Sequence, residues 1–269
     1  MAPVDMIAID MDDTLLRDDL SVSDYTIDVL RRAKESGVKV VLATGRMFRA
    51  AQPWGIRIGL GDVPLVVYTG SMIARCESGD ILSYEAMDLG IARDILACGK
   101  SHGWYMQTYI HDRLYAPWRD SRTDLYEKVC GVEAGILGDD FYTPDEPPLK
   151  ILLYEDDPAV MAEAETVLLG RFGNVAGHVR SRYNFLEFNK KGASKGAALL
   201  RLCREWKIPA DRLMTFGNAE NDVSMLSITP WSFAVANAVP EAKKAAAHGT
   251  ASNNEDGVAK AVAKYVLGE

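Results

Sequence analysis

Short apolar runs alternate with stretches of helical character along the first third of the chain. Val4 to Ile9, Val38 to Ala43 and residues 65–68 each predict a buried strand. The stretch between the first two strands has apolar residues at helical spacing. It opens with a Ser21–Asp24 capping pattern and ends at Gly37. Strands that alternate with helices in this way predict a parallel sheet with helices on its faces.

The rhythm changes in the middle of the chain. Two apolar segments, 72–76 and 81–84, flank a polar Glu77–Asp80 turn and predict a hairpin. Residues from about 86 to 185 mix helices with strands of antiparallel character, and the strand–helix alternation returns from about Lys190. An α/β unit interrupted by an inserted α+β segment is the simplest organisation with this order.

The length of 269 residues is enough for two domains, since one domain takes about 100–200 residues. We therefore expect an α/β core with a parallel sheet, formed by residues 1–84 and 188–269, and an inserted α+β domain at residues 85–187. The first residues lack the features of a signal peptide, and no apolar run approaches the roughly 18 residues that span a bilayer. A cytoplasmic protein without a membrane partner is expected.

The charge balance limits the kinds of partner. The formal net charge of −8 argues against nucleic acid or an anionic membrane as the main partner. An anionic small molecule then needs local cations, which a bound divalent metal supplies most directly. The four cysteines are widely separated and form no C-x-x-C pair. This spacing predicts reduced thiols in the cytoplasm rather than a zinc site or disulfides.

An acidic cluster follows the first predicted strand directly. Asp10 and Asp12 stand at i and i+2, and Thr14 follows at i+4. Carboxylates at the exit of a buried strand are costly unless they bind something. Two carboxylates and a hydroxyl at this spacing can hold a hard cation and do nucleophilic and acid–base work. On this segment alone an acidic turn is the alternative, because Asp and Thr are common loop and capping residues.

Polar residues recur where other predicted elements begin or end. Thr44 follows the second strand, Lys195 opens a helix, and a Gly217–Asp222 cluster follows a late strand. The carboxyl ends of parallel strands lie at one edge of a sheet, so these groups are expected to converge. Together they combine metal ligands, a hydroxyl donor and a fixed cation. That set suits phosphoryl transfer better than chemistry at a carbonyl or a nicotinamide.

Four segments at these positions resemble the haloacid dehalogenase superfamily, specifically the Cof-type phosphatases with a IIB cap. The resemblance covers both core segments and implies a Rossmann-like core with an inserted cap domain. Two tail segments, 234–238 and 251–259, also resemble this family. The four segments are Asp10–Leu16, Leu42–Arg46, Lys191–Gly196 and Phe216–Asp222.

The resemblance assigns roles to the cluster after the first strand. Asp10 is the expected nucleophile, which is ionised at neutral pH and attacks phosphorus to form an aspartyl-phosphate. Asp12 is the expected general acid and base, with a pKa above that of a free aspartate. Mg²⁺ is the expected cofactor, held by Asp10, by the backbone carbonyl of Asp12 and by Asn218.

The other segments are expected to act on the phosphoryl group. Lys195 is assigned to catalysis, where it neutralises the phosphoryl oxygens and restrains Asp10. Asp222 is assigned a supporting role, in which it orients Lys195 or metal-bound water. Taken singly, Lys195 could instead be an exposed helix lysine, and Thr44 a strand-end or N-cap residue. Asn218 and Asp222 could be turn and capping residues after a strand. Thr44 is assigned both to catalysis and to phosphate binding, and the full set expected to bind phosphate or substrate is Thr44, Gly45, Arg46, Lys195 and Asn221.

Asn218 departs from the family pattern, in which many relatives carry Asp at this position. The side-chain carbonyl of Asn218 can still bind Mg²⁺, but one negative charge is missing from the site. We therefore expect an active enzyme that needs more Mg²⁺ than a relative with Asp.

The resemblance implies Mg²⁺-dependent hydrolysis of a small phosphate monoester, such as a sugar phosphate or a flavin- or pyridoxal-type phosphate. The cap is expected to exclude water and to set substrate choice. The protein is expected to be a phosphoric monoester hydrolase that works as a monomer or weak homodimer. A phosphomutase and a non-catalytic phosphometabolite-binding protein remain the alternatives.

Overall fold

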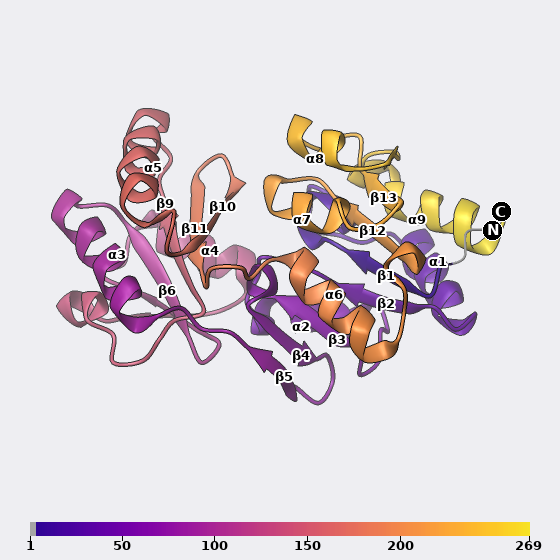
Figure 1. The fold of residues 1–269 in the computed structure, drawn as a ribbon, viewed down its shortest axis with the longest axis horizontal. Helices are drawn as coiled ribbons and strands as arrows, with labels where there is room; N and C mark the ends of the chain where they lie inside the picture. The colour runs from indigo at the N-terminus through magenta and orange to yellow at the C-terminus, as the bar shows by residue number, and fades with distance from the viewer. Residues whose placement is uncertain (1–3) are drawn as a thin grey trace. The chain divides into compact units, whose positions relative to one another are not determined.

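The computed structural model describes residues 4–269, so the first three residues of the predicted core lie outside the described range. The central sheet has five parallel strands in the order β14-β13-β12-β1-β2 (Figure 1). All four residues of β1 are fully buried, which explains why its sequence is a continuous apolar run rather than an alternating one. The strands are β1 (Met6–Ile9), β2 (Lys39–Leu42), β12 (Leu213–Gly217), β13 (Trp231–Ala234) and β14 (His248–Gly249).

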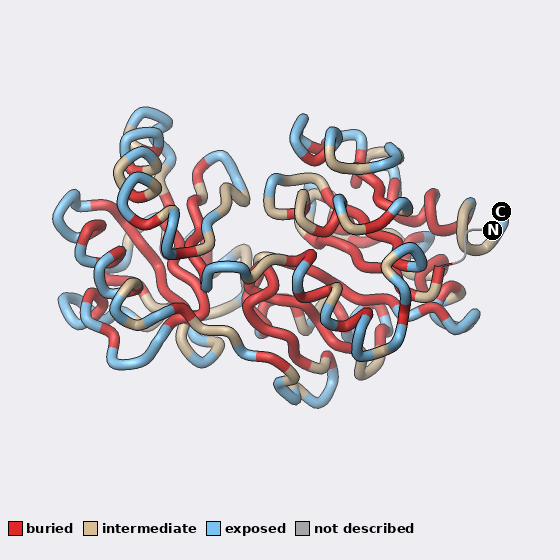
Figure 2. Tube along the Cα trace, in the orientation of Figure 1, coloured by how far each residue is buried: buried red, intermediate tan, exposed pale blue. Residues whose placement is uncertain are grey.

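Helices cover this parallel sheet. Helix α6 buries Leu199 and Leu202 in one apolar cluster with Met6 and Ala8 of β1. Met6 and Ala8 share a face of the sheet because side chains alternate along a strand. Figure 2 shows the strands as buried and the outer sides of the helices as exposed. The helices are α1 (Asp24–Glu35), α2 (Phe48–Arg57), α6 (Lys195–Trp206), α7 (Val223–Leu226), α8 (Pro240–Ala245) and α9 (Gly257–Val262).

Helix α1 begins later than the capping pattern predicts. Ser23 is its N-cap, and the Ser23 Oγ accepts a hydrogen bond from the Thr26 N–H at 3.0 Å. The prediction of a cap at Ser21 is therefore wrong. The end of the helix agrees with the sequence, because the helix stops at Glu35 and Gly37 follows with a φ of +97°. Glycine adopts this left-handed conformation without the steric cost that other residues have.

A smaller sheet of three strands holds the predicted hairpin. β3 (Pro64–Val67) pairs antiparallel with β4 (Met72–Arg75), and β5 (Ile81–Tyr84) completes the sheet. A parallel bridge between Ala43 and Val66 connects β3 to the chain just after β2. The sequence predicts β3 as a further member of the parallel sheet, whereas its ladder partner is the antiparallel β4.

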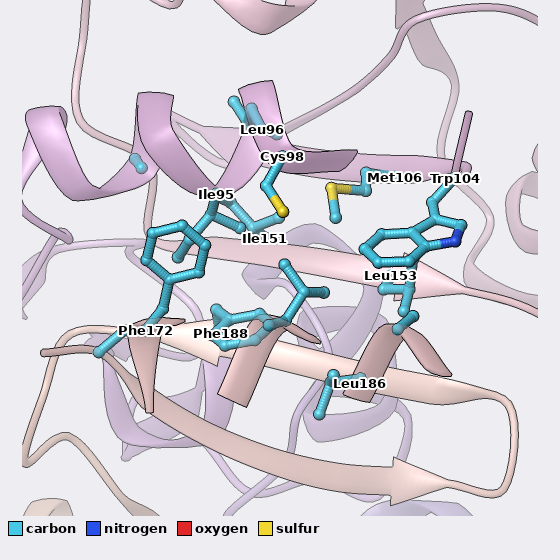
Figure 3. Close-up of a cluster of buried hydrophobic side chains, with 14 of the residues drawn as sticks. Ile95, Leu96, Cys98, Trp104, Met106, Ile151, Leu153, Phe172, Leu186 and Phe188 are labelled. Carbon is cyan, nitrogen blue, oxygen red and sulfur yellow. The ribbon is translucent and has the colours of Figure 1, made fainter. Parts of the chain in front are cut away.

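A six-stranded sheet in the order β10-β11-β9-β6-β7-β8 forms the inserted part of the chain, and it is antiparallel except at the β7–β8 pair. Helices α3 and α5 pack on one face, where Ile95, Phe172 and Phe188 belong to one apolar cluster (Figure 3). Helix α4 is the third helix of this part. The elements are α3 (Leu89–His102), β6 (Met106–Ile110), β7 (Arg113–Ala116), α4 (Ser121–Cys130), β8 (Ala134–Ile136), β9 (Lys150–Tyr154), α5 (Pro158–Phe172), β10 (Gly177–Arg182) and β11 (Phe185–Asn189).

The chain divides into two compact units. The first comprises residues up to Gly45, Ala51–Ser83 and Ser194–Glu269, and the second comprises Arg46–Ala50 and Tyr84–Ala193. The α/β class with a parallel sheet is confirmed. The predicted domain limits after residues 84 and 187 stay a prediction, and the compact units change after residues 83 and 193. Among residues 4–269, no helix has the length and apolar character needed to cross a membrane.

Candidate active site

The acidic cluster forms a tight turn at the carboxyl end of β1. The Asp10 N–H donates to the Phe216 carbonyl of β12 at 3.0 Å, so the turn begins while the chain is still paired with its neighbour. Asp13 has a φ of +57°, and the Leu16 N–H donates back to the Met11 carbonyl at 2.8 Å. Asp10 is thereby held beside the end of β12, on the side of the sheet where the parallel strands have their carboxyl ends. Its side chain is buried there, and the residue is 5% exposed.

Lys195 joins two buried carboxylates. Its Nζ donates to Oδ1 of Asp10 and to Oδ1 of Asp222, each at 2.6 Å. Lys195 and Asp222 have no exposed surface. Lys195 is the first residue of α6, whose N-cap Ser194 accepts a hydrogen bond from the Ala197 N–H at 3.1 Å. The structure thus brings together three of the residues that the sequence proposes for the site, although they come from distant parts of the chain.

Three ionisable groups in one buried cluster shift each other's pKa values. Burial, followed by the neighbouring Asp222 carboxylate, raises the pKa of Asp10 to about 7, although Lys195 opposes this shift. Burial disfavours the Lys195 ammonium, but the carboxylates of Asp10 and Asp222 outweigh it and raise the pKa of Lys195 above its ordinary value. Lys195 therefore stays charged at neutral pH, and Asp10 is harder to ionise than a free aspartate. The role of Asp10 as an ionised nucleophile stays a prediction.

Asp222 has donors for both of its carboxylate oxygens. Its Oδ1 accepts from Lys195, and its Oδ2 accepts from the backbone N–H groups of Asn218 at 2.8 Å and Ala219 at 3.0 Å. A Cβ at Gly217 would lie 2.5 Å from the Asp222 Cβ, so this close packing requires glycine. Asp222 is therefore placed to orient Lys195 and the Asn218 loop rather than to bind a cation directly.

The oxygen atoms near Asn218 fit a hard cation. Thr14 Oγ1 donates to Asn218 Oδ1 at 3.1 Å, which fixes the orientation of this amide. Asn221 Oδ1 is buried without a hydrogen-bond partner, a costly condition that a ligand would relieve. Within residues 4–269, no group of three or more His, Cys, Asp or Glu side chains is arranged to hold a metal. A cation here would therefore combine the Asp10 carboxylate with amide and backbone oxygens, a set that Mg²⁺ accepts.

The Thr44 segment follows the neighbouring strand β2. Thr44 is 1% exposed; its N–H donates to the Val66 carbonyl at 2.8 Å, and its carbonyl accepts from the Thr69 N–H at 3.0 Å. The turns after β2 and β3 are thus tied together. Gly45 is the last residue of the first segment of the first compact unit, and Arg46 belongs to the second unit. Arg46 is buried. The phosphate contacts predicted for Thr44, Gly45 and Arg46 stay predictions.

A turn with left-handed backbone conformations follows β3 and packs closely against the start of α6. Tyr68 and Thr69 have φ values of +52° and +55°, and Gly70 follows at +97°. A Cβ on Gly70 would lie 2.2 Å from the Ser194 carbonyl oxygen and 3.1 Å from the Lys195 nitrogen. Backbone strain of this kind is concentrated at functional sites. The sequence predicts that the strand ends at Thr69 and Gly70 but assigns the turn no role, and Gly70 directly after an apolar strand is the signal that marks it.

Comparisons with known proteins agree with this arrangement. A family model described as haloacid dehalogenase-like hydrolase matches residues 7–262. The chain is 33% identical to YxeH of Bacillus subtilis over 97% of this chain and 98% of YxeH. The name of YxeH describes it as a phosphatase. It is 26% identical to YitU of the same species, named as a 5-amino-6-(5-phospho-D-ribitylamino)uracil phosphatase, over 97% of each chain. The crystal structure of TM0651 from Thermotoga maritima matches with a TM-score of 0.83 and 25% identity, over 97% of each chain.

Proposed function

The chain belongs to the haloacid dehalogenase-like hydrolase family, and we propose that it is a phosphatase that hydrolyses small phosphate monoesters through a covalent intermediate on Asp10. The relatives YxeH and YitU, both named as phosphatases, support a phosphoric monoester hydrolase. The observation that carries the proposal is Lys195, whose Nζ lies 2.6 Å from Oδ1 of both Asp10 and Asp222. A buried charge cluster is a poor source of stability, so a role in chemistry accounts for it better.

Asp10 is the nucleophile in this proposal. Lys195 holds one carboxylate oxygen of Asp10, which leaves the other oxygen for in-line attack on phosphorus. The bond from phosphorus to the leaving oxygen breaks, and that oxygen takes a proton from Asp12. A water molecule then gives a proton to Asp12 and attacks the phosphorus of the aspartyl-phosphate. Inorganic phosphate leaves and the Asp10 carboxylate is restored.

The remaining residues of the proposal neutralise and orient the phosphoryl group. Lys195 carries the fixed positive charge that the phosphoryl oxygens need, and its raised pKa keeps that charge in place. Asp222 holds the Lys195 ammonium in position. The residues proposed to contact phosphate or substrate are Thr44, Gly45, Arg46, Lys195 and Asn221.

Mg²⁺ is the proposed cofactor. When bound, it supplies positive charge next to the phosphoryl oxygens. The proposed ligands are a carboxylate oxygen of Asp10, the backbone carbonyl of Asp12 and the side-chain carbonyl of Asn218. Burial raises the pKa of the Asp10 carboxyl to about 7, so Asp10 would be favoured in its ionised, attacking form if a cation were bound beside it.

The proposed substrates are small phosphorylated metabolites, either sugar phosphates or cofactor-type phosphates such as the one in the name of YitU. The inserted α+β part, predicted at residues 85–187, is the proposed cap that sets this choice. The net charge of −8 opposes binding to nucleic acid or an anionic membrane. The four cysteines are widely separated and form no C-x-x-C pair, and a cytoplasmic location is proposed. A monomer or weak homodimer is proposed.

Phosphate release from a panel of phosphorylated metabolites in the presence of Mg²⁺ tests this function. We expect wild-type protein to release phosphate from at least one sugar or cofactor phosphate. Asp10→Asn keeps the side-chain shape and removes the nucleophile, so turnover should fall by roughly 10⁴-fold or more. Asp19→Asn, in an exposed loop, is the matched control and should stay within about twofold of wild type.

Two results would change the proposal. Wild-type turnover in Asp10→Asn would exclude Asp10 as the nucleophile. Transfer of labelled phosphate to a second hydroxyl of the substrate, instead of to water, would identify a phosphomutase.

A further inference from the structure

Two asparagine side chains from the C-terminal part of the chain hold the turn that carries Asp12. Asn237 Nδ2 donates to the Asp13 carbonyl at 2.7 Å. Asn253 Nδ2 donates to the Leu16 carbonyl at 3.1 Å. The Asn253 N–H also donates to Asn237 Oδ1 at 3.1 Å, so the second asparagine orients the first. The two asparagines, linked through the Asn253 backbone, therefore form a relay that reaches the turn at two points.

The turn has a backbone that needs such support. Asp12 is extended, with φ −68° and ψ 128°, and Asp13 is left-handed, with φ +57°. A left-handed conformation is uncommon for residues other than glycine. Within the turn, the Leu15 N–H donates to the Asp10 carbonyl at 3.3 Å and the Leu16 N–H to the Met11 carbonyl at 2.8 Å. The asparagine relay supplies donors to later carbonyls of the same turn.

The relay is anchored at both ends. Asn253 is 3% exposed, and its Nδ2 also donates to Asp18 Oδ1 at 3.0 Å. Two residues after Asn237, the Val239 N–H donates to the Asn218 carbonyl at 2.8 Å. The loop after β13 thus contacts the residue next to Asp12 and the residue proposed as a metal ligand. A single loop fixes both parts of the site.

We propose that Asn237 and Asn253 are positioning residues that fix the Asp12 turn for proton transfer to the leaving oxygen. The proposal rests on the general-acid role given to Asp12 under the proposed function. Proton transfer requires the acid within hydrogen-bond reach of the leaving oxygen, and a displacement of about 1 Å can cost about 10²-fold in rate. Loss of the Asn237 amide removes its hydrogen bond to the carbonyl of Asp13, the residue next to Asp12.

The dependence of kcat/KM on the leaving group tests this role. An alkyl phosphate needs a proton on its leaving oxygen, whereas para-nitrophenyl phosphate has a leaving group that departs without one. We expect Asn237→Ala to lower kcat/KM for the best alkyl phosphate of the panel by about tenfold and for para-nitrophenyl phosphate by less than about twofold. Asn254→Ala is the matched control, because the Asn254 Oδ1 accepts from the Asp18 N–H at 3.2 Å, beyond the turn.

Asn253→Ala and the double variant test the relay itself. Asn253→Ala keeps the backbone N–H that donates to Asn237 Oδ1 and removes the side-chain contact with the Leu16 carbonyl. Since both side chains fix the same turn, the loss in the double variant should be smaller than the product of the two single losses. Far-UV circular dichroism and thermal unfolding would check that each variant is folded. Equal losses on both substrates in folded Asn237→Ala, or no loss on either, would overturn the proposal, as would independent effects of the two asparagines.

Asp12→Ala on the same two substrates separates this inference from the proposed function. A selective loss on the alkyl phosphate in Asp12→Ala, without one in Asn237→Ala, rejects the relay and leaves the general acid in place. Without a selective loss in Asp12→Ala, the general-acid role fails, and the relay proposal falls with it.

Discussion

At the scale of the residue, the site depends on one ammonium group shared by two carboxylates. Lys195 contacts both Asp10 and Asp222, and Asp222 also accepts two backbone N–H groups. Both oxygens of Asp222 therefore accept hydrogen bonds, whereas Lys195 contacts only one oxygen of Asp10. This difference supports the proposal that Asp10 is the nucleophile and Asp222 a positioning residue.

The raised pKa of Asp10 predicts a specific pH dependence of stability. In the unfolded chain Asp10 loses its proton near its ordinary pKa of 3.8, whereas in the folded protein it does so at about 7. The folded state therefore binds more protons between these values, and the stability that Asp10 contributes is complete below pH 3.8 and lost as pH rises through about 7. In EDTA, wild type should lose roughly 2–4 kcal/mol relative to Asp10→Asn over this range.

Urea unfolding of both proteins at about pH 4 and about pH 8 measures this difference. Parallel pH profiles for wild type and Asp10→Asn would show that burial and Asp222 do not raise the pKa of Asp10.

Asn218 sets the charge of the proposed metal site. Asn218→Asp adds a carboxylate beside the Asp10 turn, and the Thr14 hydroxyl that now donates to Asn218 Oδ1 can donate to it equally well. We expect Mg²⁺ to bind about tenfold more tightly, since ligand charge strengthens the binding of hard cations. Calorimetric titration with Mg²⁺ measures this change. Asn174→Asp adds the same charge at an exposed position and should leave the affinity unchanged; if Asn218→Asp does likewise, residue 218 is not a ligand.

At the scale of the element, the strained turn after β3 sets the position of the start of α6. Gly70 and Gly37 both have a φ of +97°, but their surroundings differ. A Cβ on Gly70 would meet the Ser194 carbonyl at 2.2 Å, whereas a Cβ on Gly37 would meet nothing within 4 Å. Substituting alanine at these two glycines therefore separates two losses of folding stability. One comes from the left-handed backbone conformation, and the other from the steric clash of the new Cβ with the start of α6.

Gly70→Ala should therefore be much more harmful than Gly37→Ala. We expect Gly37→Ala to cost about 1–2 kcal/mol for the left-handed conformation alone and Gly70→Ala to cost at least about 4 kcal/mol. Gly70→Ala should also lower kcat, because it displaces Lys195 at the start of α6. Urea unfolding and phosphate release measure the two effects. Equal costs at the two glycines would mean that the turn after β3 can move away from α6.

At the scale of the whole molecule, the two compact units have separate apolar cores. Phe188 lies in the cluster formed by β11, α3 and α5, and Leu202 lies in the cluster of α6 and the parallel sheet. Both side chains are fully buried. Truncation of either should therefore weaken the unit that contains it first.

Phe188→Ala should cost about 3–5 kcal/mol in the second unit, because it leaves a cavity in a packed core. Hydrogen exchange measured by mass spectrometry should show loss of protection in α3, α5 and β11, with β1 and β12 unchanged. Leu202→Ala truncates a side chain in the core of the first unit. It should lower the protection of β1 and β12 against hydrogen exchange instead. Uniform loss of protection across the chain in either variant would show that the two units unfold as one.

Local patterns in the sequence determined much of this protein. Apolar runs and helical spacing were enough to predict the parallel sheet, the inserted α+β part and α6. Hydrophobic periodicity depends only on residues close together in the chain, so it can be read from the sequence. The order of the motifs also predicted that Asp10, Lys195 and Asp222 would meet, since parallel strands end at one edge. Ser23 escaped prediction because several nearby residues could serve as the cap of α1.

Only the tertiary structure decided how the acidic turn after β1 works. The contact of Lys195 with Asp10 and the contacts of Asn237 and Asn253 with the turn each join residues more than 180 positions apart in the chain. Burial and hydrogen-bond partners depend on such distant contacts, and neither is encoded by the spacing of nearby residues. The sequence therefore determined which residues stand at the site, and the packing of the chain decided their charge and their support.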